Sequence, residues 1–162
     1  MTDQNKNGTF DGALQIAEFQ EDGFQEDELT ALGLLETIQD HPDNDQLFQT
    51  DLALGVCNQK LGRMDVAASF FRKVLEKHAY LPQALLPMAE ISYENRQFLG
   101  ARGFIERYFS TGSVSSRSLF LATMIEIELD DEHSSKRYYR ELTNKFPDTR
   151  EAKKASSVLN LI

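Results

Sequence analysis

One pattern of residue types recurs in this chain at a fixed spacing of 34 residues. Each copy has a small residue, a residue that opens a second helical stretch, another small residue and then a large apolar one, although the third copy keeps the pattern imperfectly. The copies are Gly55, Met64, Ala67 and Phe71, then Ala89, Phe98, Ala101 and Ile105, and finally Thr123, Glu132, Ser135 and Tyr139. A period of about 20–50 residues indicates a stacked array of one supersecondary unit.

Helical periodicity dominates between the Gly and Pro breakers, and strand-like alternation is scarce. The predicted helices span 12–22, 26–39, 46–61, 64–78, 82–95, 98–110, 115–129, 132–145 and 149–160. Two helices joined by short turns fill each period, so neighbours should be antiparallel. A helix–turn–helix unit of this length is the signature of the tetratricopeptide repeat (TPR). We therefore predict an all-α TPR α-α superhelix, or solenoid, with a C-terminal capping helix.

We expect a single TPR domain over residues 1–162. It would comprise a flexible N-terminus (1–11), a divergent helix pair (12–45), three TPR units (46–147) and a capping helix (148–162), which Asp148 would cap together with Glu151. The small residues should let paired helices approach closely. Phe71, Ile105 and Tyr139 should then fill the gap towards the following repeat.

Catalytic and metal-binding patterns are missing from the sequence. The three histidines are scattered, and the single cysteine, Cys57, is expected to be a buried structural thiol. Residues 3–11 resemble half of an EF-hand calcium loop, but Leu14 stands where a bidentate Glu should close it. The acidic residues 130–132 are expected to be solvated in a turn. We therefore predict no enzymatic activity, no cofactor, no metal and no small-molecule substrate.

Charge is distributed unevenly along the chain. Residues 1–59 carry 13 acids and one base, whereas residues 60–162 carry 13 acids and 16 bases. Phosphate binding needs clustered Lys and Arg, so the acidic first third argues against nucleic acid. It could attract a basic partner, but a solvated acidic cap at one end of the solenoid is the simpler interpretation.

The first helix of each TPR unit is expected to line a concave face, where polar residues surround an apolar stripe. We predict that nine inward residues bind a partner: Leu52, Val56, Gln59, Leu86, Glu90, Tyr93, Phe120, Met124 and Ile127. An exposed apolar stripe with a polar rim marks a protein-binding surface. An apolar or amphipathic segment of another protein would fit it. Alternatively, a neighbouring helix or the chain's own terminus covers part of it.

Two stretches carry a family resemblance: ALLPMAEISYENRQFLGARGFIERYFSTG (84–112) and SLFLATMIEIELDDEHSSKRYYRELTNKFPDTREA (118–152). Together with residues 51–86 they resemble the type IV pilus biogenesis TPR proteins PilF and PilW. The resemblance implies a pilotin, a non-enzymatic outer-membrane lipoprotein that helps the pilus secretin reach the outer membrane and assemble.

The resemblance also implies a location at the periplasmic face of the outer membrane, with membrane contact only through a lipid anchor that this sequence does not carry. No signal peptide is visible in the polar first ten residues. The alternative prediction is a cytoplasmic TPR adaptor or co-chaperone that binds an apolar peptide or helix.

Overall fold

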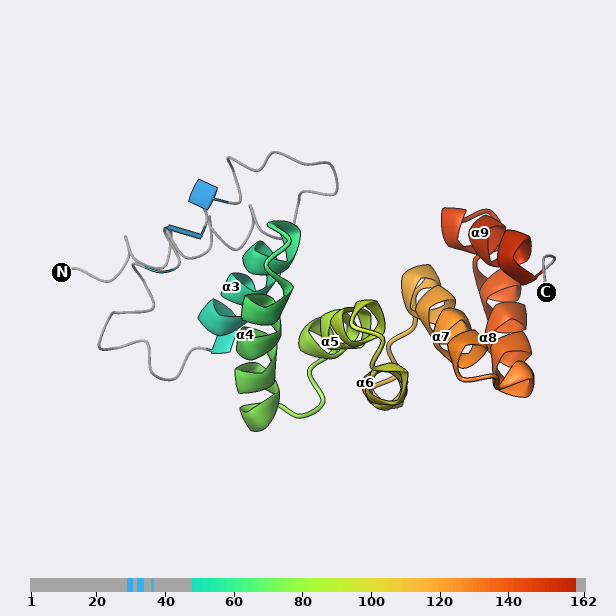
Figure 1. Ribbon diagram of the computed structural model, residues 1–162, viewed down its shortest axis with the longest axis horizontal. Helices are drawn as coiled ribbons and strands as arrows, with labels where there is room; N and C mark the ends of the chain where they lie inside the picture. Colours follow the sequence, from blue (N-terminus) through green and yellow to red (C-terminus); the bar gives the residue numbers. More distant parts are fainter. Residues whose placement is uncertain (1–28, 31, 34–35, 37–47, 160–162) are drawn as a thin grey trace. The chain divides into compact units, whose positions relative to one another are not determined.

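The computed structural model describes residues 29–30, 32–33, 36 and 48–159. Residues 48–159 form seven helices and no strand (Figure 1): α3 (Phe48–Lys60), α4 (Met64–Lys77), α5 (Pro82–Glu94), α6 (Phe98–Ser110), α7 (Ser116–Glu128), α8 (Glu132–Lys145) and α9 (Arg150–Leu159). Each helix begins and ends within about two residues of its predicted bounds. The all-α TPR prediction is thereby confirmed.

Most of the predicted N-terminal elements lie outside the described residues. These include the flexible N-terminus (1–11), the first helix of the divergent pair (12–22), the calcium-loop stretch (3–14) and His41. Within the predicted helix 26–39, residues 29–30, 32–33 and 36 are described, and all of them are helical.

The chain divides into two compact units, Met1–Ala79 and Tyr80–Ile162. In the first unit, α3 and α4 pack side by side as an antiparallel pair (Figure 1). Gly55 of α3 allows this approach, because a Cβ at that position would lie 2.7 Å from Cε1 of Phe71 on α4. The Phe71 ring is therefore packed against α3 inside its own helix pair.

A small apolar cluster surrounds the cysteine of the first unit. Leu32, Ala53, Leu54 and Cys57 are all buried, and Val56 packs against the cluster. Cys57 is 0% exposed, so the prediction of a buried structural thiol is confirmed.

The second unit contains two helix pairs, α5–α6 and α7–α8, followed by α9. Helix α6 also packs on α7, while α9 packs on both α7 and α8. In the first pair, Ala89, Ala101 and Ile105 are fully buried. In the second pair, hydroxyl residues take the small-residue places, and each bonds to its own helix: Thr123 Oγ1 donates to the Leu119 carbonyl (2.8 Å) and Ser135 Oγ to that of Glu132 (3.0 Å).

The turn inside each helix pair repeats with the sequence period. Gly62, Arg96 and Asp130 all have positive φ, at 74°, 58° and 56°. Each turn also has the paired hydrogen bonds of a Schellman motif, such as those from Gly62 N to Gln59 O (3.0 Å) and from Arg63 N to Asn58 O (2.8 Å). Glycine adopts this backbone conformation without steric cost, whereas Arg and Asp adopt it under strain.

Helix α9 is the first helix of a fourth repeat that ends the described array. Its first residue, Arg150, lies 34 residues after the first residue of α7. Ser157 is exposed in α9, at the place where Gly55, Ala89 and Thr123 are buried against a second helix. Among residues 48–159, no second helix therefore covers this place on α9.

The cap of α9 differs in detail from the prediction. Thr149 precedes the helix, and its Oγ1 accepts a hydrogen bond from the backbone N–H of Ala152 (3.3 Å). The N-cap is therefore Thr149, and the prediction of Asp148 was wrong by one residue. Tyr139 does reach the next element, because its hydroxyl bonds to Ser156 Oγ on α9 (2.9 Å).

Candidate protein-binding face

The first unit holds three of the nine predicted binding residues. Leu52, Val56 and Gln59 lie on α3 and are each partly exposed. Leu54, a packing residue of the same helix, is 0% exposed. Because Val56 also packs against the core cluster, part of its apolar surface is already used inside the unit.

The second unit holds the other six, which we name the α5–α7 face: Leu86, Glu90, Tyr93, Phe120, Met124 and Ile127. All six are partly exposed. The packing residues of the same helices, Met88 and Ala122, are only 2% and 0% exposed. Helices α5 and α7 contact each other directly, so these residues occupy two adjacent helices. The inward and packing positions thus differ in burial as helical periodicity requires.

An ion pair joins the two helices across this face. Arg117 at the start of α7 binds Glu90 of α5, with Nη2 2.7 Å from Oε2. The Glu90 side chain is only 12% exposed. Glu90 is therefore neutralised within the face. Both residues occupy inward positions in the sequence, and their opposite charges were the signal that could have predicted the pair.

The end of α5 places an aromatic group beside α7. Tyr93 packs against Phe98, with 5.6 Å between ring centroids. Burial raises the pKa of Tyr93, and the negative charge of Glu128 on α7 raises it further, while Arg96 acts in the opposite direction. Arg96 itself lies over the Phe98 ring, 5.6 Å from its centroid. Tyr93 thus belongs to the apolar face and also lies near the Glu128 carboxylate of α7.

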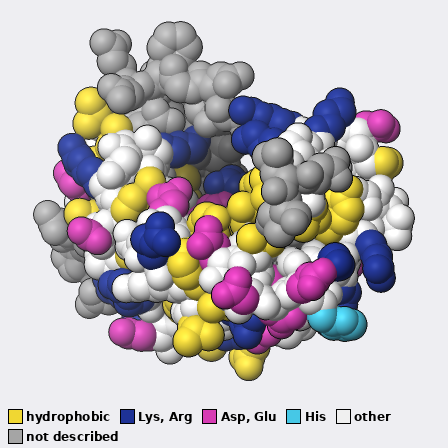
Figure 2. Space-filling view, turned by 45° about the vertical axis from the view of Figure 1, so that its right-hand side comes forward, with side chains coloured by type: hydrophobic (Ala, Val, Ile, Leu, Met, Phe, Trp, Pro, Cys, Tyr) yellow, Lys and Arg dark blue, Asp and Glu magenta, His cyan; other side chains and the backbone are white. Residues whose placement is uncertain are grey.

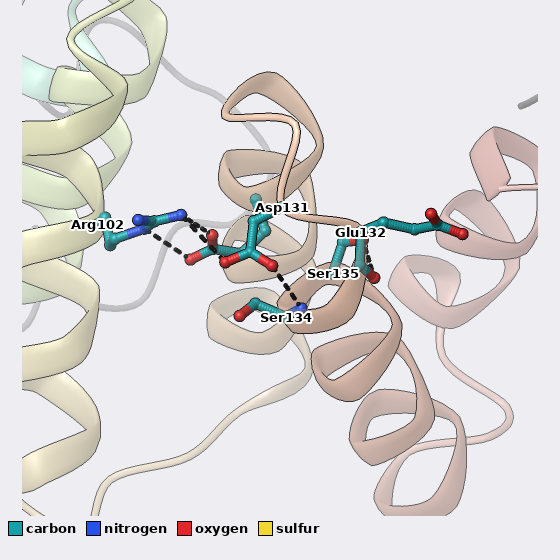
Figure 3. A network of polar contacts seen from close by, with 6 residues as sticks. Arg102, Asp131, Glu132, Ser134 and Ser135 are labelled. Atoms are coloured by element: carbon teal, nitrogen blue, oxygen red, sulfur yellow. Dashed lines mark hydrogen bonds and ion pairs between the residues drawn. The ribbon is translucent and has the colours of Figure 1, made fainter.

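A polar network on the other side of α7 ties it to α6 (Figure 3). Arg102 of α6 donates from Nε to Glu126 Oε1 (3.1 Å), and its Nη2 pairs with the other oxygen. The same Nη2 lies 3.6 Å from Asp131 Oδ2. Glu126 is only 3% exposed, whereas Arg102 is 28% exposed. The hydrogen bond from Arg102 to Glu126 raises the pKa of the guanidinium.

This network corrects our prediction for residues 130–132 at Asp131 alone, because Asp130 and Glu132 are exposed as predicted. Asp131 caps α8 by accepting a hydrogen bond from Ser134 N (2.9 Å). That bond, together with Arg102, lowers the pKa of the Asp131 carboxyl. Sequence reasoning missed Glu126 altogether. The signal was the period itself, because Asn58, Ser92 and Glu126 stand 34 residues apart and are all buried polar residues.

Charged and apolar side chains alternate over the surface shown in Figure 2, where acidic groups lie among hydrophobic ones. No helix in residues 48–159 is long and apolar enough to cross a membrane.

Known proteins resemble this chain in sequence and in fold. The tetratricopeptide repeat family model matches residues 49–79. The type IV pilus assembly protein PilF of Pseudomonas aeruginosa is 26% identical over 120 residues, which cover 73% of this chain and 46% of that protein. The chain thus spans about half the length of this curated relative.

Solved structures give the same fold. The structure of Pseudomonas aeruginosa PilF matches with a TM-score of 0.81 at 19% identity, covering 95% of this chain and 67% of that one. PilW, a widely conserved type IV pilus biogenesis factor, matches with a TM-score of 0.74 at 16% identity, covering 92% of this chain and 66% of that one. A tetratricopeptide repeat protein from Parabacteroides merdae matches with a TM-score of 0.77 at 13% identity, covering 97% of this chain and 59% of that one.

Family model and fold together define the class: the chain is a tetratricopeptide-repeat protein, a fold that typically serves as a protein-binding scaffold. Within that class, it is similar in sequence to the type IV pilus assembly protein PilF and similar in fold to PilF and PilW.

Proposed function

We propose that this chain is a non-enzymatic scaffold of pilotin type, which binds the pilus secretin and helps it reach and assemble in the outer membrane. It would act at the periplasmic face of that membrane. The sequence relationship to PilF supports the link to pilus assembly. The TPR fold supports a role in binding protein.

The observation that carries the proposal is the apolar part of the α5–α7 face. Leu86, Phe120, Met124 and Ile127 remain partly exposed although adjacent positions on the same helices are fully buried. Large apolar side chains gathered on one face mark an interaction site. A partner that covered them would contribute up to about 1 kcal/mol for each side chain.

The experiment is co-purification of the secretin with the tagged chain from envelope extracts. Phe120→Glu places a charge in the centre of the face and should lower secretin recovery by about tenfold or more, since burial of an unpaired charge is costly. The matched control is Leu99→Glu on α6, where the side chain is already 73% exposed. Circular dichroism would verify that both variants fold. Unchanged secretin recovery with folded Phe120→Glu would overturn the proposed face.

A further inference from the structure

We infer that the segment bound by the α5–α7 face carries a lysine or arginine beside its apolar residues, at the edge where α5 and α7 end. This inference rests on the proposed function, because it specifies the chemistry of the partner at the same face. It follows from the direction of the two helices and from the charges at their ends.

Helices α5 and α7 have their C-terminal ends at the same edge of the face, because successive helices in the array alternate in direction. Their last residues are Glu94 and Glu128, and both side chains are exposed. They directly follow Tyr93 and Ile127, which belong to the face. Among residues 48–159, no Lys or Arg forms an ion pair with either carboxylate.

The helix ends strengthen this negative edge. The C-terminal end of a helix carries a partial negative charge, so two such ends beside two carboxylates attract cations. Glu90 stands about one turn before Glu94 on α5, and Arg117 of α7 neutralises it, so Glu90 does not add to this negative charge. The face is therefore largely apolar and becomes acidic where α5 and α7 end, which favours a bound segment of matching polarity.

The equivalent place on α3 of the first unit carries the opposite charge. The residue equivalent to Glu94 and Glu128 in the first unit is Lys60, at the end of α3. A partner that carries one basic residue beside its apolar stretch would therefore prefer the α5–α7 face to the corresponding part of α3. This preference would fix the position of the segment along the repeats.

The test uses two synthetic amphipathic peptides with identical Leu-rich faces, one with two Lys at one end and the other with two Glu. Binding is measured by fluorescence anisotropy at low ionic strength. We expect the Lys peptide to bind roughly fivefold more tightly. The difference should shrink at high salt, because exposed charges are screened.

Paired variants connect this preference to the named residues. Glu94→Gln with Glu128→Gln should abolish the difference between the peptides, and Phe120→Glu should weaken both. Glu132→Gln with Glu141→Gln, which changes two acids on α8, should leave the difference unchanged. Equal affinity for both peptides, tighter binding of the Glu peptide or no effect of the Glu94 and Glu128 changes would overturn the inference. Binding of neither peptide would also overturn it, while secretin co-purification tests the proposed function separately.

Discussion

The Arg102–Glu126 pair allows a sharp test of how α6 is joined to α7. In Arg102→Met, the apolar stem of the side chain is retained while the charge is removed. Glu126 would then be left without its cation, although its side chain is only 3% exposed. Removing one partner of a fully buried ion pair costs about 3–5 kcal/mol.

The expected loss for Arg102→Met is somewhat smaller. Arg102 is 28% exposed, so water can partly replace the missing guanidinium. We therefore expect the free energy of unfolding to fall by about 2–4 kcal/mol. For a chain of this length, the melting temperature would fall by roughly 4–16 °C. Urea unfolding, followed by circular dichroism at pH 7, measures the first quantity, and a thermal scan measures the second.

Two comparisons test the reasoning. Lys136→Met removes an exposed ion pair with Glu132 on one turn of α8, and should cost less than about 0.5 kcal/mol. The double variant Arg102→Met, Glu126→Met should recover most of the loss, because it leaves no buried charge. If Arg102→Met costs no more than Lys136→Met, the pair contributes as little as a surface pair. If the double variant recovers nothing, the loss comes from packing of the arginine stem instead.

Three further predictions concern the backbone and the acidic turn. Gly55→Ala should lower the free energy of unfolding, measured in urea, by about 1–3 kcal/mol, because the new Cβ would collide with the Phe71 ring. Gly103→Ala, in the exposed middle of α6, should raise it by about 0.5–1 kcal/mol. Equal effects of the two changes would contradict the packing described. Gly62 and Arg96 both have positive φ, which glycine adopts without steric cost. Gly62→Ala should therefore lower the free energy of unfolding by about 1 kcal/mol, and Arg96→Gly should raise it by about 1 kcal/mol. A less stable Arg96→Gly protein would refute the strain argument. The pKa of Asp131 is lowered in the folded state, so its carboxylate stabilises the fold above the unfolded pKa of about 3.9, and this contribution is lost as pH falls through the lower folded value. Asp131→Asn should therefore flatten the acid side of the stability curve, and an unchanged curve would contradict this assignment.

The sequence period was sufficient to predict the helices of residues 48–159. Small residues at fixed places and Gly or Pro at the turns determine where each helix begins and ends, and these signals are local. The left-handed turns at Arg96 and Asp130 were harder to predict, because neither residue favours positive φ as glycine does. Only their alignment with Gly62, one and two periods earlier, indicates this conformation.

The candidate site was less predictable than the fold. Helical periodicity separates inward from packing residues, so the partial exposure of the α5–α7 face follows from spacing alone. Ion pairs between repeats depend on side-chain reach across helices, which spacing does not give. The sequence holds a signal for Glu90 with Arg117 in their opposite charges, and for Glu126 in the period, but only the placed helices show that each acid forms an ion pair and with which residue.

The buried polar position is satisfied differently in the first and third repeats. The buried side-chain amide of Asn58 finds a hydrogen-bond partner in its own helix, because its Nδ2 donates to the Leu54 carbonyl (2.8 Å). The ionised carboxylate of Glu126 has no hydrogen to donate, so its burial requires a cation from another helix. Arg102 supplies that cation from the preceding pair. The α7–α8 pair, in which Thr and Ser occupy the small-residue places, is thus joined to α6 by a charged contact as well as by apolar packing. Loss of this contact should loosen the α6–α7 junction before it disturbs either helix pair itself.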